Sequence, residues 1–157
     1  FALVPFFAES TKLPYDTLNA RTETIATANS YRGPWRRRQF CLVPMRTFTE
    51  PNHESGKSQW WDVYRRDGEP FAVAGLYDRW TSPTGELYWS FTLPTINSDL
   101  HPLMKRFHRP GKEKRSVVVL PKDSYDAWLD ARTDGEARAL FQLFDESQFD
   151  AGPVEKV

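Results

Sequence analysis

Hydrophobic and polar residues alternate along several short segments in the middle of the chain. In residues 59–65, for example, Trp61 and Val63 share one face, whereas the polar Asp62 lies on the other. This alternation, or a run of β-branched residues, predicts further extended segments at 39–43, 44–50, 71–77, 87–93 and 117–120. The turn-forming residues at 66–69 are typical of a hairpin between two antiparallel strands.

Helices are expected before and after this block of strands in the sequence. A first helix should end at about residue 30, before the Gly33-Pro34 pair. A second helix should place Trp128 and Leu129 on one face, and a third is expected at 135–144. Because the strands outnumber the helices and cluster together, the pattern predicts an α+β fold with a mostly antiparallel, barrel-like β-sheet core and a few flanking helices.

The length of 157 residues fits one domain that spans 1–157. The chain opens with Phe1 inside an apolar segment and without an initiator methionine, so we expect the domain to be incomplete at its N-terminus. Residues 145–157 are expected to form a loose tail. No apolar run approaches the roughly 20 residues of a membrane span, and no secretion signal is present. We therefore expect a cytoplasmic monomer.

Cysteine and histidine are scarce, which limits the chemistry. The single cysteine, Cys41, lies inside an apolar segment, excludes an internal disulfide and is expected to be structural. His53 lies in a polar loop, His101 is a further candidate, and for His108 a site role and a structural role are both open. Metal-ligand spacings, a phosphate-binding loop and a nucleophile elbow are all absent from the sequence, so we expect neither a metal nor a cofactor.

Charge is distributed unevenly although the net charge is zero. Residues 1–120 contain 17 Lys and Arg against 12 Asp and Glu, whereas 121–157 contain 4 against 9. Basic residues cluster at 36–38 and at 105–115, as expected for a nucleic-acid-binding groove, although a solvated surface is the simpler alternative. The candidate DNA-binding residues are all arginines: Arg21, Arg36, Arg37, Arg38, Arg109 and Arg115.

Residues 19–24 carry an amide, a guanidinium, a carboxylate and two hydroxyls, a composition too polar for a core strand. Asn19 offers two donors and an acceptor, and Arg21 presents a planar fork suited to phosphate or carboxylate. A helix start capped near Thr22 is the simpler interpretation. Both interpretations stay open from the residues alone, as does the role of Glu50, which precedes Pro51 in a Thr-rich extended segment.

Several of these segments occur together in one protein family. The matching segments, in order, are 3–5, 19–24, 41–44 leading to Glu50, 71–76, 90–92, His108, 118–120 and 125–129. With this set, residues 1–131 resemble the SRAP (SOS response-associated peptidase) family, whose members trap abasic sites in single-stranded DNA. The resemblance implies an SRAP-like fold and single-stranded DNA with abasic sites as the partner.

The resemblance also implies a mechanism. In the family, an N-terminal cysteine reacts with the ring-opened aldehyde of the abasic site and forms a thiazolidine. The catalytic residues would be Asn19, which orients the nucleophile, Glu50, which transfers protons, and His108, which assists ring opening. Arg21 would neutralise a neighbouring phosphate.

The sequence departs from the family pattern at three points. The family's N-terminal cysteine would lie upstream of Phe1, Pro51 replaces the tryptophan that follows the glutamate, and residues 109–113 interrupt the segment after His108. One alternative is therefore a non-covalent binding module for single-stranded nucleic acid that has lost the reaction. A protease, as the family name suggests, is a further alternative, although no Ser/His or Cys/His pair is recognisable in the sequence.

Overall fold

The computed structural model describes residues 1–154. Its strands are β1 (Asn19–Arg21), β2 (Phe40–Met45), β3 (Thr47–Asn52), β4 (Gln59–Arg65), β5 (Phe71–Thr81), β6 (Leu87–Asn97), β7 (Arg115–Val117), β8 (Val119–Leu120) and β9 (Phe149–Pro153). Its helices are α1 (Arg32–Arg36), α2 (Tyr125–Asp130) and α3 (Asp134–Ala139), together with the short 3₁₀ helices η1 (Met104–Arg106), η2 (Lys122–Ser124) and η3 (Glu146–Gln148).

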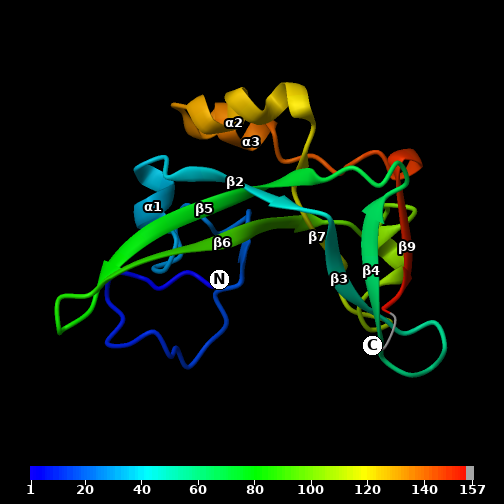
Figure 1. Cartoon of the computed structure of the whole chain (residues 1–157), viewed down its shortest axis with the longest axis horizontal. Helices are drawn as coiled ribbons and strands as arrows, with labels where there is room; N and C mark the ends of the chain where they lie inside the picture. The colour runs from blue at the N-terminus through cyan, green and yellow to red at the C-terminus, as the bar shows by residue number, and fades with distance from the viewer. Residues whose placement is uncertain (155–157) are drawn as a thin grey trace.

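The strands form two β-sheets. The long β5–β6 hairpin forms the centre of the first sheet, in which β2 pairs antiparallel with β5 and β1 pairs parallel with β6. A smaller sheet with the order β3-β4-β9 stands at one end of this hairpin (Figure 1). Only Arg46 separates β2 from β3, so the chain passes directly from one sheet into the other. The predicted α+β class with a mostly antiparallel, curled sheet is confirmed.

Two hydrophobic clusters hold these layers together. In the first, α2 and α3 cover one face of the large sheet, as Figure 1 shows. Trp128 of α2 is fully buried, stacks on Phe40 with ring centroids 4.2 Å apart, and donates its indole N–H to the Cys41 carbonyl at 3.0 Å. The second cluster joins the two sheets through aromatic residues such as Phe71, Phe107 and Phe149. Because β5 is covered on both faces, its first six residues are all buried.

The first helix was expected to end at about residue 30, and this prediction is wrong. Residues 22–31 form a succession of turns, and α1 begins only at Arg32. The Gly33-Pro34 pair lies inside α1 rather than beyond its end. Proline is tolerated there because the backbone N–H groups of a first helical turn have no partner within the helix. The burial of Trp35, which is 3% exposed, fixes this short helix against the sheet.

The other predicted helices are also corrected. Leu129 does not share the buried face of Trp128, since it is 43% exposed. The third helix, expected to reach residue 144, ends at Ala139. Phe144 lies instead in the cluster between the two sheets, 4.5 Å from the Phe149 ring.

The expected loose tail at 145–157 is ordered over its described part. Phe149–Pro153 form β9, which pairs antiparallel with β4, and Phe149 is 3% exposed. Residues 155–157 lie outside the described residues. Most predicted strands are present, but β5 and β6 extend beyond the expected 71–77 and 87–93, and Pro51 lies inside β3 rather than ending it. The expected strand at 117–120 is divided between β7 and β8, and the turn at 66–69 does not close a hairpin, because β4 and β5 belong to different sheets. An edge position allows this proline, because β3 is the outer strand of the sheet β3-β4-β9.

Candidate functional site

A largely buried carboxyl group and an imidazole meet where β3 faces the segment after η1. Alternation along β3 turns Phe48, Glu50 and Asn52 inward, while Thr47 and Thr49 are exposed. The Oε2 atom of Glu50 lies 3.4 Å from Nε2 of His108, 58 residues further along the chain.

Asn52 positions the histidine. Its backbone forms a bridge with Phe107, and its side-chain amide donates to the Arg106 carbonyl at 3.2 Å. The backbone N–H of His108 then donates to the Pro51 carbonyl at 2.8 Å. His108 itself has φ = +60°, an unusual conformation for a residue other than glycine, which these contacts maintain. Sequence reasoning missed Asn52, whose only signal was its place in the inward alternation of β3.

Burial shifts both members of the pair toward their neutral forms. It raises the pKa of Glu50 from 4.5 to about 7, and it lowers the pKa of His108. The Arg115 carbonyl lies 3.3 Å from Nε2 of His108 and can only accept, so Nε2 carries the hydrogen. Near pH 7, Glu50 is therefore poised between a proton donor and a proton acceptor beside a neutral imidazole.

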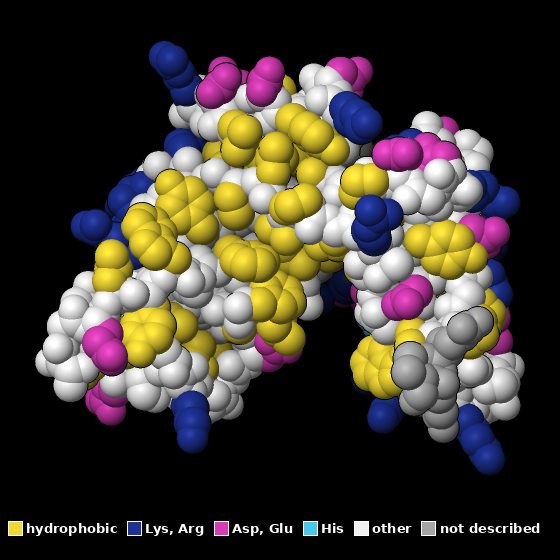
Figure 2. All heavy atoms as spheres, in the orientation of Figure 1, with side chains coloured by type: hydrophobic (Ala, Val, Ile, Leu, Met, Phe, Trp, Pro, Cys, Tyr) yellow, Lys and Arg dark blue, Asp and Glu magenta, His cyan; other side chains and the backbone are white. Residues whose placement is uncertain are grey.

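Asn19 and Glu50 line the same cavity, of about 540 Å³. Most of its wall is apolar, with contributions from Val43, Phe48 and Phe91, and the other polar residues that line it are two threonines of β3. Figure 2 shows the hydrophobic side chains gathered across the middle of the face that β2 and β5 cross in Figure 1.

His108 lines a neighbouring groove of about 410 Å³. Arg109, Lys112 and Trp60 also line this groove, and the indole of Trp60 is 59% exposed. The Glu50–His108 contact thus connects the cavity with the groove. Asn19 lines the cavity, whereas His108 lines the groove. Sequence reasoning did not single out Trp60 or Lys112, although both lay in segments recognised as aromatic or basic.

The six candidate arginines do not form one surface. Arg36 and its two neighbours lie on or just after α1, at the far end of the large sheet from β3 and β4 (Figure 1). Arg37 binds both carboxylate oxygens of the buried Asp78, at 3.0 and 3.1 Å. Arg38 donates to the carbonyls of Trp35 and Arg132. These contacts give two of the three a structural role.

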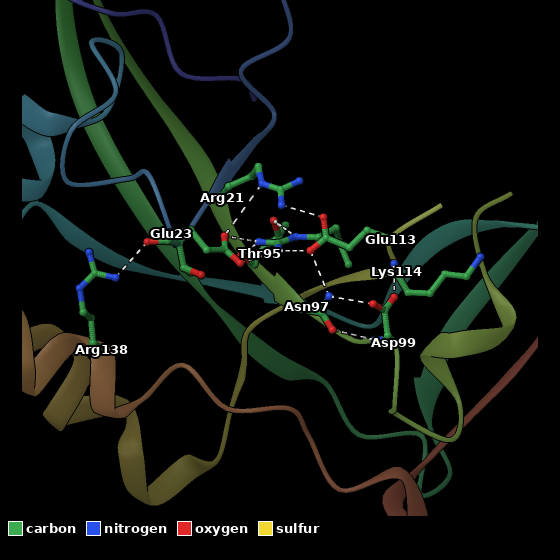
Figure 3. A network of polar contacts seen from close by, with 10 residues as sticks. Arg21, Glu23, Thr95, Asn97, Asp99, Glu113, Lys114 and Arg138 are labelled. Carbon is green, nitrogen blue, oxygen red and sulfur yellow. Dashed lines mark hydrogen bonds and ion pairs between the residues drawn. The ribbon is translucent and has the colours of Figure 1, made fainter. Parts of the chain in front are cut away.

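Arg21 and Arg115 both bind Glu113 at the junction of β1, β6 and β7. Figure 3 shows Arg21 and Glu113 within this polar network. Arg115 binds Glu23 through both terminal nitrogens, at 2.7 and 2.8 Å, and its side chain is only 13% exposed. Arg21 binds Glu113 at 2.6 Å. Arg109 is the remaining candidate; within residues 1–154 its side chain forms no hydrogen bond or ion pair.

Cys41 and His101 are held in structural positions. Burial raises the pKa of the Cys41 thiol to about 11, so the thiolate is scarce at neutral pH. His101 is 4% exposed; its Nδ1 accepts from two backbone N–H groups at the start of η1, and its Nε2 donates to the Phe144 carbonyl at 2.9 Å. His101 therefore anchors the segment that leads to the site.

Three further observations concern the described residues as a whole. Within 1–154, no three or more His, Cys, Asp or Glu side chains come together in a group that could hold a metal ion. Over the same residues, every helix is too short or too polar to cross a membrane. No histidine of this part of the chain hydrogen-bonds a serine, threonine or cysteine side chain.

Comparison with known proteins gives a consistent result. The family model for "SOS response associated peptidase (SRAP)" matches residues 1–157. The abasic site processing protein YoqW of Bacillus subtilis is 28% identical, with 100% of this chain and 68% of the relative covered. The rat protein HMCES, also named an abasic site processing protein, is 28% identical over 83% of this chain and 43% of its own length.

Solved structures agree with this assignment. A crystal structure of a Bordetella bronchiseptica protein superposes with a TM-score of 0.92 at 34% identity, over 99% of this chain and 75% of that one. A Bacteroides thetaiotaomicron protein has a TM-score of 0.79 at 27% identity, over 98% of this chain and 67% of that one. The chain therefore belongs to the SRAP family.

Proposed function

We propose that this chain binds single-stranded DNA at abasic sites and provides the acid–base residues for covalent trapping of those sites. The observation that carries the proposal is the Glu50–His108 contact beside the cavity that Asn19 shares with Glu50. These three residues come from separate parts of the sequence, and the family resemblance implies a role for each. The names of the relatives, which describe abasic site processing, support the same assignment.

The chemistry requires a group that both gives and takes a proton. An amine that attacks the aldehyde carbon of a ring-opened abasic site loses a proton, and the resulting hydroxyl must gain one before it departs as water. A carboxyl group with a pKa of about 7 suits both steps at neutral pH. A thiol then adds to the imine carbon, its proton passes to the nitrogen, and the five-membered thiazolidine closes.

The nucleophile of this reaction is not among the 157 residues. The ring contains both the amine and the thiol of one N-terminal cysteine, whereas Cys41 lies inside β2 and its amine is part of a peptide bond. The proposal therefore assigns binding and proton transfer to this chain, and the nucleophile to an N-terminal cysteine upstream of it. Without such a cysteine, the same site would bind abasic DNA without a covalent bond.

The groove beside His108 offers a path for the DNA strand. Trp60 presents an exposed ring on which a base can stack, and Arg109 and Lys112 provide positive charge for the backbone. A strand in this groove would pass the Glu50–His108 contact, where an abasic sugar, lacking a base, could enter the cavity. This arrangement also explains why the path does not need the arginines at 36–38.

Fluorescence anisotropy with a labelled 11-nucleotide strand tests the binding step. We expect affinity to fall as salt rises from low to physiological concentration, because phosphate contacts release counterions. Lys112→Gln should weaken binding and reduce the salt dependence, whereas Lys122→Gln, an exposed lysine on the helical side of the molecule, should change neither. Affinity that does not depend on salt, or equal effects of the two variants, would contradict the proposed path.

The proton-transfer step is tested in a protein that carries this chain behind an N-terminal cysteine. Glu50→Gln keeps the shape of the side chain but removes the transferable proton, so adduct formation with an abasic strand should slow by about 10²-fold or more. Denaturing electrophoresis measures the adduct. An unchanged rate at saturating DNA would remove Glu50 from the mechanism while leaving the binding proposal intact.

A further inference from the structure

An anion-binding arrangement borders the groove, which Glu113 and Arg115 line, and a carboxylate of the chain itself occupies this arrangement. Glu113 accepts hydrogen bonds from Arg21 at 2.6 Å, from Arg115 at 2.8 Å and from the Asn97 amide at 3.0 Å. Figure 3 shows Arg21 and Asn97 converging on this carboxylate. Two guanidinium groups and an amide form the kind of donor set that also binds a phosphate group.

Two of the three donors, Arg115 and Asn97, have further partners besides Glu113. Glu23 holds Arg115 through two hydrogen bonds of 2.7 and 2.8 Å, and the Thr95 carbonyl accepts a further one. Arg21 also lies 4.0 Å from Glu23. The site is therefore organised by its own surroundings, which lowers the cost of binding another anion in place of the carboxylate.

The charges also match one phosphate. With Glu113 present, the two arginines are balanced by two glutamates, and the cluster is neutral. When the Glu113 carboxylate is withdrawn, the remaining groups carry a net charge of +1. A phosphate diester of a DNA backbone carries one negative charge and would restore neutrality.

The carboxylate has room to leave. Glu113 is at the end of 109–113, the segment between His108 and β7, where Gly111 has φ = +74°. Asp99 fixes the following residue by accepting the Lys114 N–H at 2.6 Å, so movement would be confined to the segment before it. The side chains of Glu113 and Arg21 are 34% and 54% exposed, and Glu113 lines the same groove as Trp60.

We propose that Glu113 is an internal competitor that occupies a phosphate site of the DNA groove and is displaced by the backbone of the bound strand. This proposal rests on the function proposed above. In this proposal, residues 109–113 act as a gate. In the closed state, the Glu113 carboxylate pairs with Arg21 and Arg115. Moving the carboxylate away costs free energy, and this cost lowers the affinity for DNA. The three donors lower the pKa of Glu113 to about 2, so competition with an anion, rather than protonation, would release the carboxylate at neutral pH.

Glu113→Gln tests the gate. The variant removes the competing charge, so a labelled oligothymidine strand should bind up to about fivefold more tightly, the upper end of the range expected from one exposed ion pair. Glu69→Gln is the matched control, because it removes the same charge from an exposed turn where the side chain forms no ion pair within residues 1–154. Adding Arg21→Gln to Glu113→Gln should abolish the gain.

A second probe separates this proposal from the proposed function. Pyrophosphate, followed by calorimetric titration, should also bind Glu113→Gln more tightly than the parent chain. Circular dichroism verifies that the variants are folded. If the parent chain and every variant fail to bind DNA, the proposed function is wrong, while the pyrophosphate comparison still shows whether Glu113 competes with an anion for the two arginines. Equal affinity of the folded variant and the parent chain for pyrophosphate, or equal affinity for DNA, would overturn the gate.

Discussion

Replacement of Glu50 by glutamine should increase the stability of the protein at alkaline pH and leave it unchanged in acid. The Glu50 side chain is 18% exposed, and burial raises its pKa from 4.5 to about 7. Between these two pH values the folded state binds more protons at this position than the unfolded state. The free energy of unfolding of the parent chain therefore falls as pH rises through this interval, by an amount set by the pKa difference.

The size of this change in the free energy of unfolding follows from the pKa difference of Glu50. At 1.36 kcal/mol per pH unit, the change from 4.5 to about 7 corresponds to about 3 kcal/mol. Glutamine has no charge to desolvate, so Glu50→Gln should be more stable than the parent chain by up to about 3 kcal/mol at pH 8, and equally stable near pH 4. Burial lowers the pKa of His108, which acts with the opposite sign in both proteins.

Urea unfolding at several pH values, followed by the fluorescence of the six tryptophans, measures this difference. Glu69→Gln, an exposed substitution, should stay within about 0.5 kcal/mol of the parent chain throughout. A Glu50→Gln effect that is the same at pH 4 and pH 8 would show that Glu50 ionises as an ordinary surface carboxyl group. The acid–base role proposed for it would then lose its physical basis.

Three further predictions concern the scaffold. Gly75→Ala should lower the free energy of unfolding by about 1–3 kcal/mol, because its Cβ would lie 2.6 Å from the Cys41 sulfur and 2.9 Å from a Val43 methyl group; adding Cys41→Ala should recover part of the loss in urea unfolding. His101→Ala should cost about 2 kcal/mol or more in the same assay, because it leaves a buried carbonyl and two backbone N–H groups without partners; no loss would mean that water replaces the ring. Incubation of the 157-residue chain with an abasic strand should give no shifted band on denaturing electrophoresis, because the thiol with a pKa of about 11 is mostly protonated; a shift that depends on Cys41 would contradict its structural role.

Local pattern was sufficient for the strands but not for the helices or the C-terminal segment. The alternation in β4 is a short-range signal and was predicted correctly. The turn before β5 was expected to close a hairpin, but it connects two different sheets, a pairing that the turn residues alone do not reveal. The position of α1 was missed because a proline can either end a helix or open one. The strand β9 was missed because its partner β4 lies more than 80 residues away in the sequence.

The candidate site likewise depends on contacts between residues that are distant in the sequence. Composition alone left the roles of Asn19, Glu50 and His108 open, and only their order in a family pattern grouped them. The Glu50–His108 contact depends on the fold, since Asn52 and η1 bring the histidine to β3. The partnership of Arg21 with Glu113, 92 residues apart, has no signal in the sequence beyond the complementary charges.

A crystal structure of the chain bound to a single strand with a tetrahydrofuran abasic-site analogue tests the central claim most directly. The account predicts that the sugar without a base enters the cavity shared by Asn19 and Glu50, within hydrogen-bond distance of the Glu50 carboxyl group, and that the flanking backbone follows the groove lined by Trp60 and Lys112. A strand bound elsewhere on the molecule, with this cavity left to solvent, would contradict it.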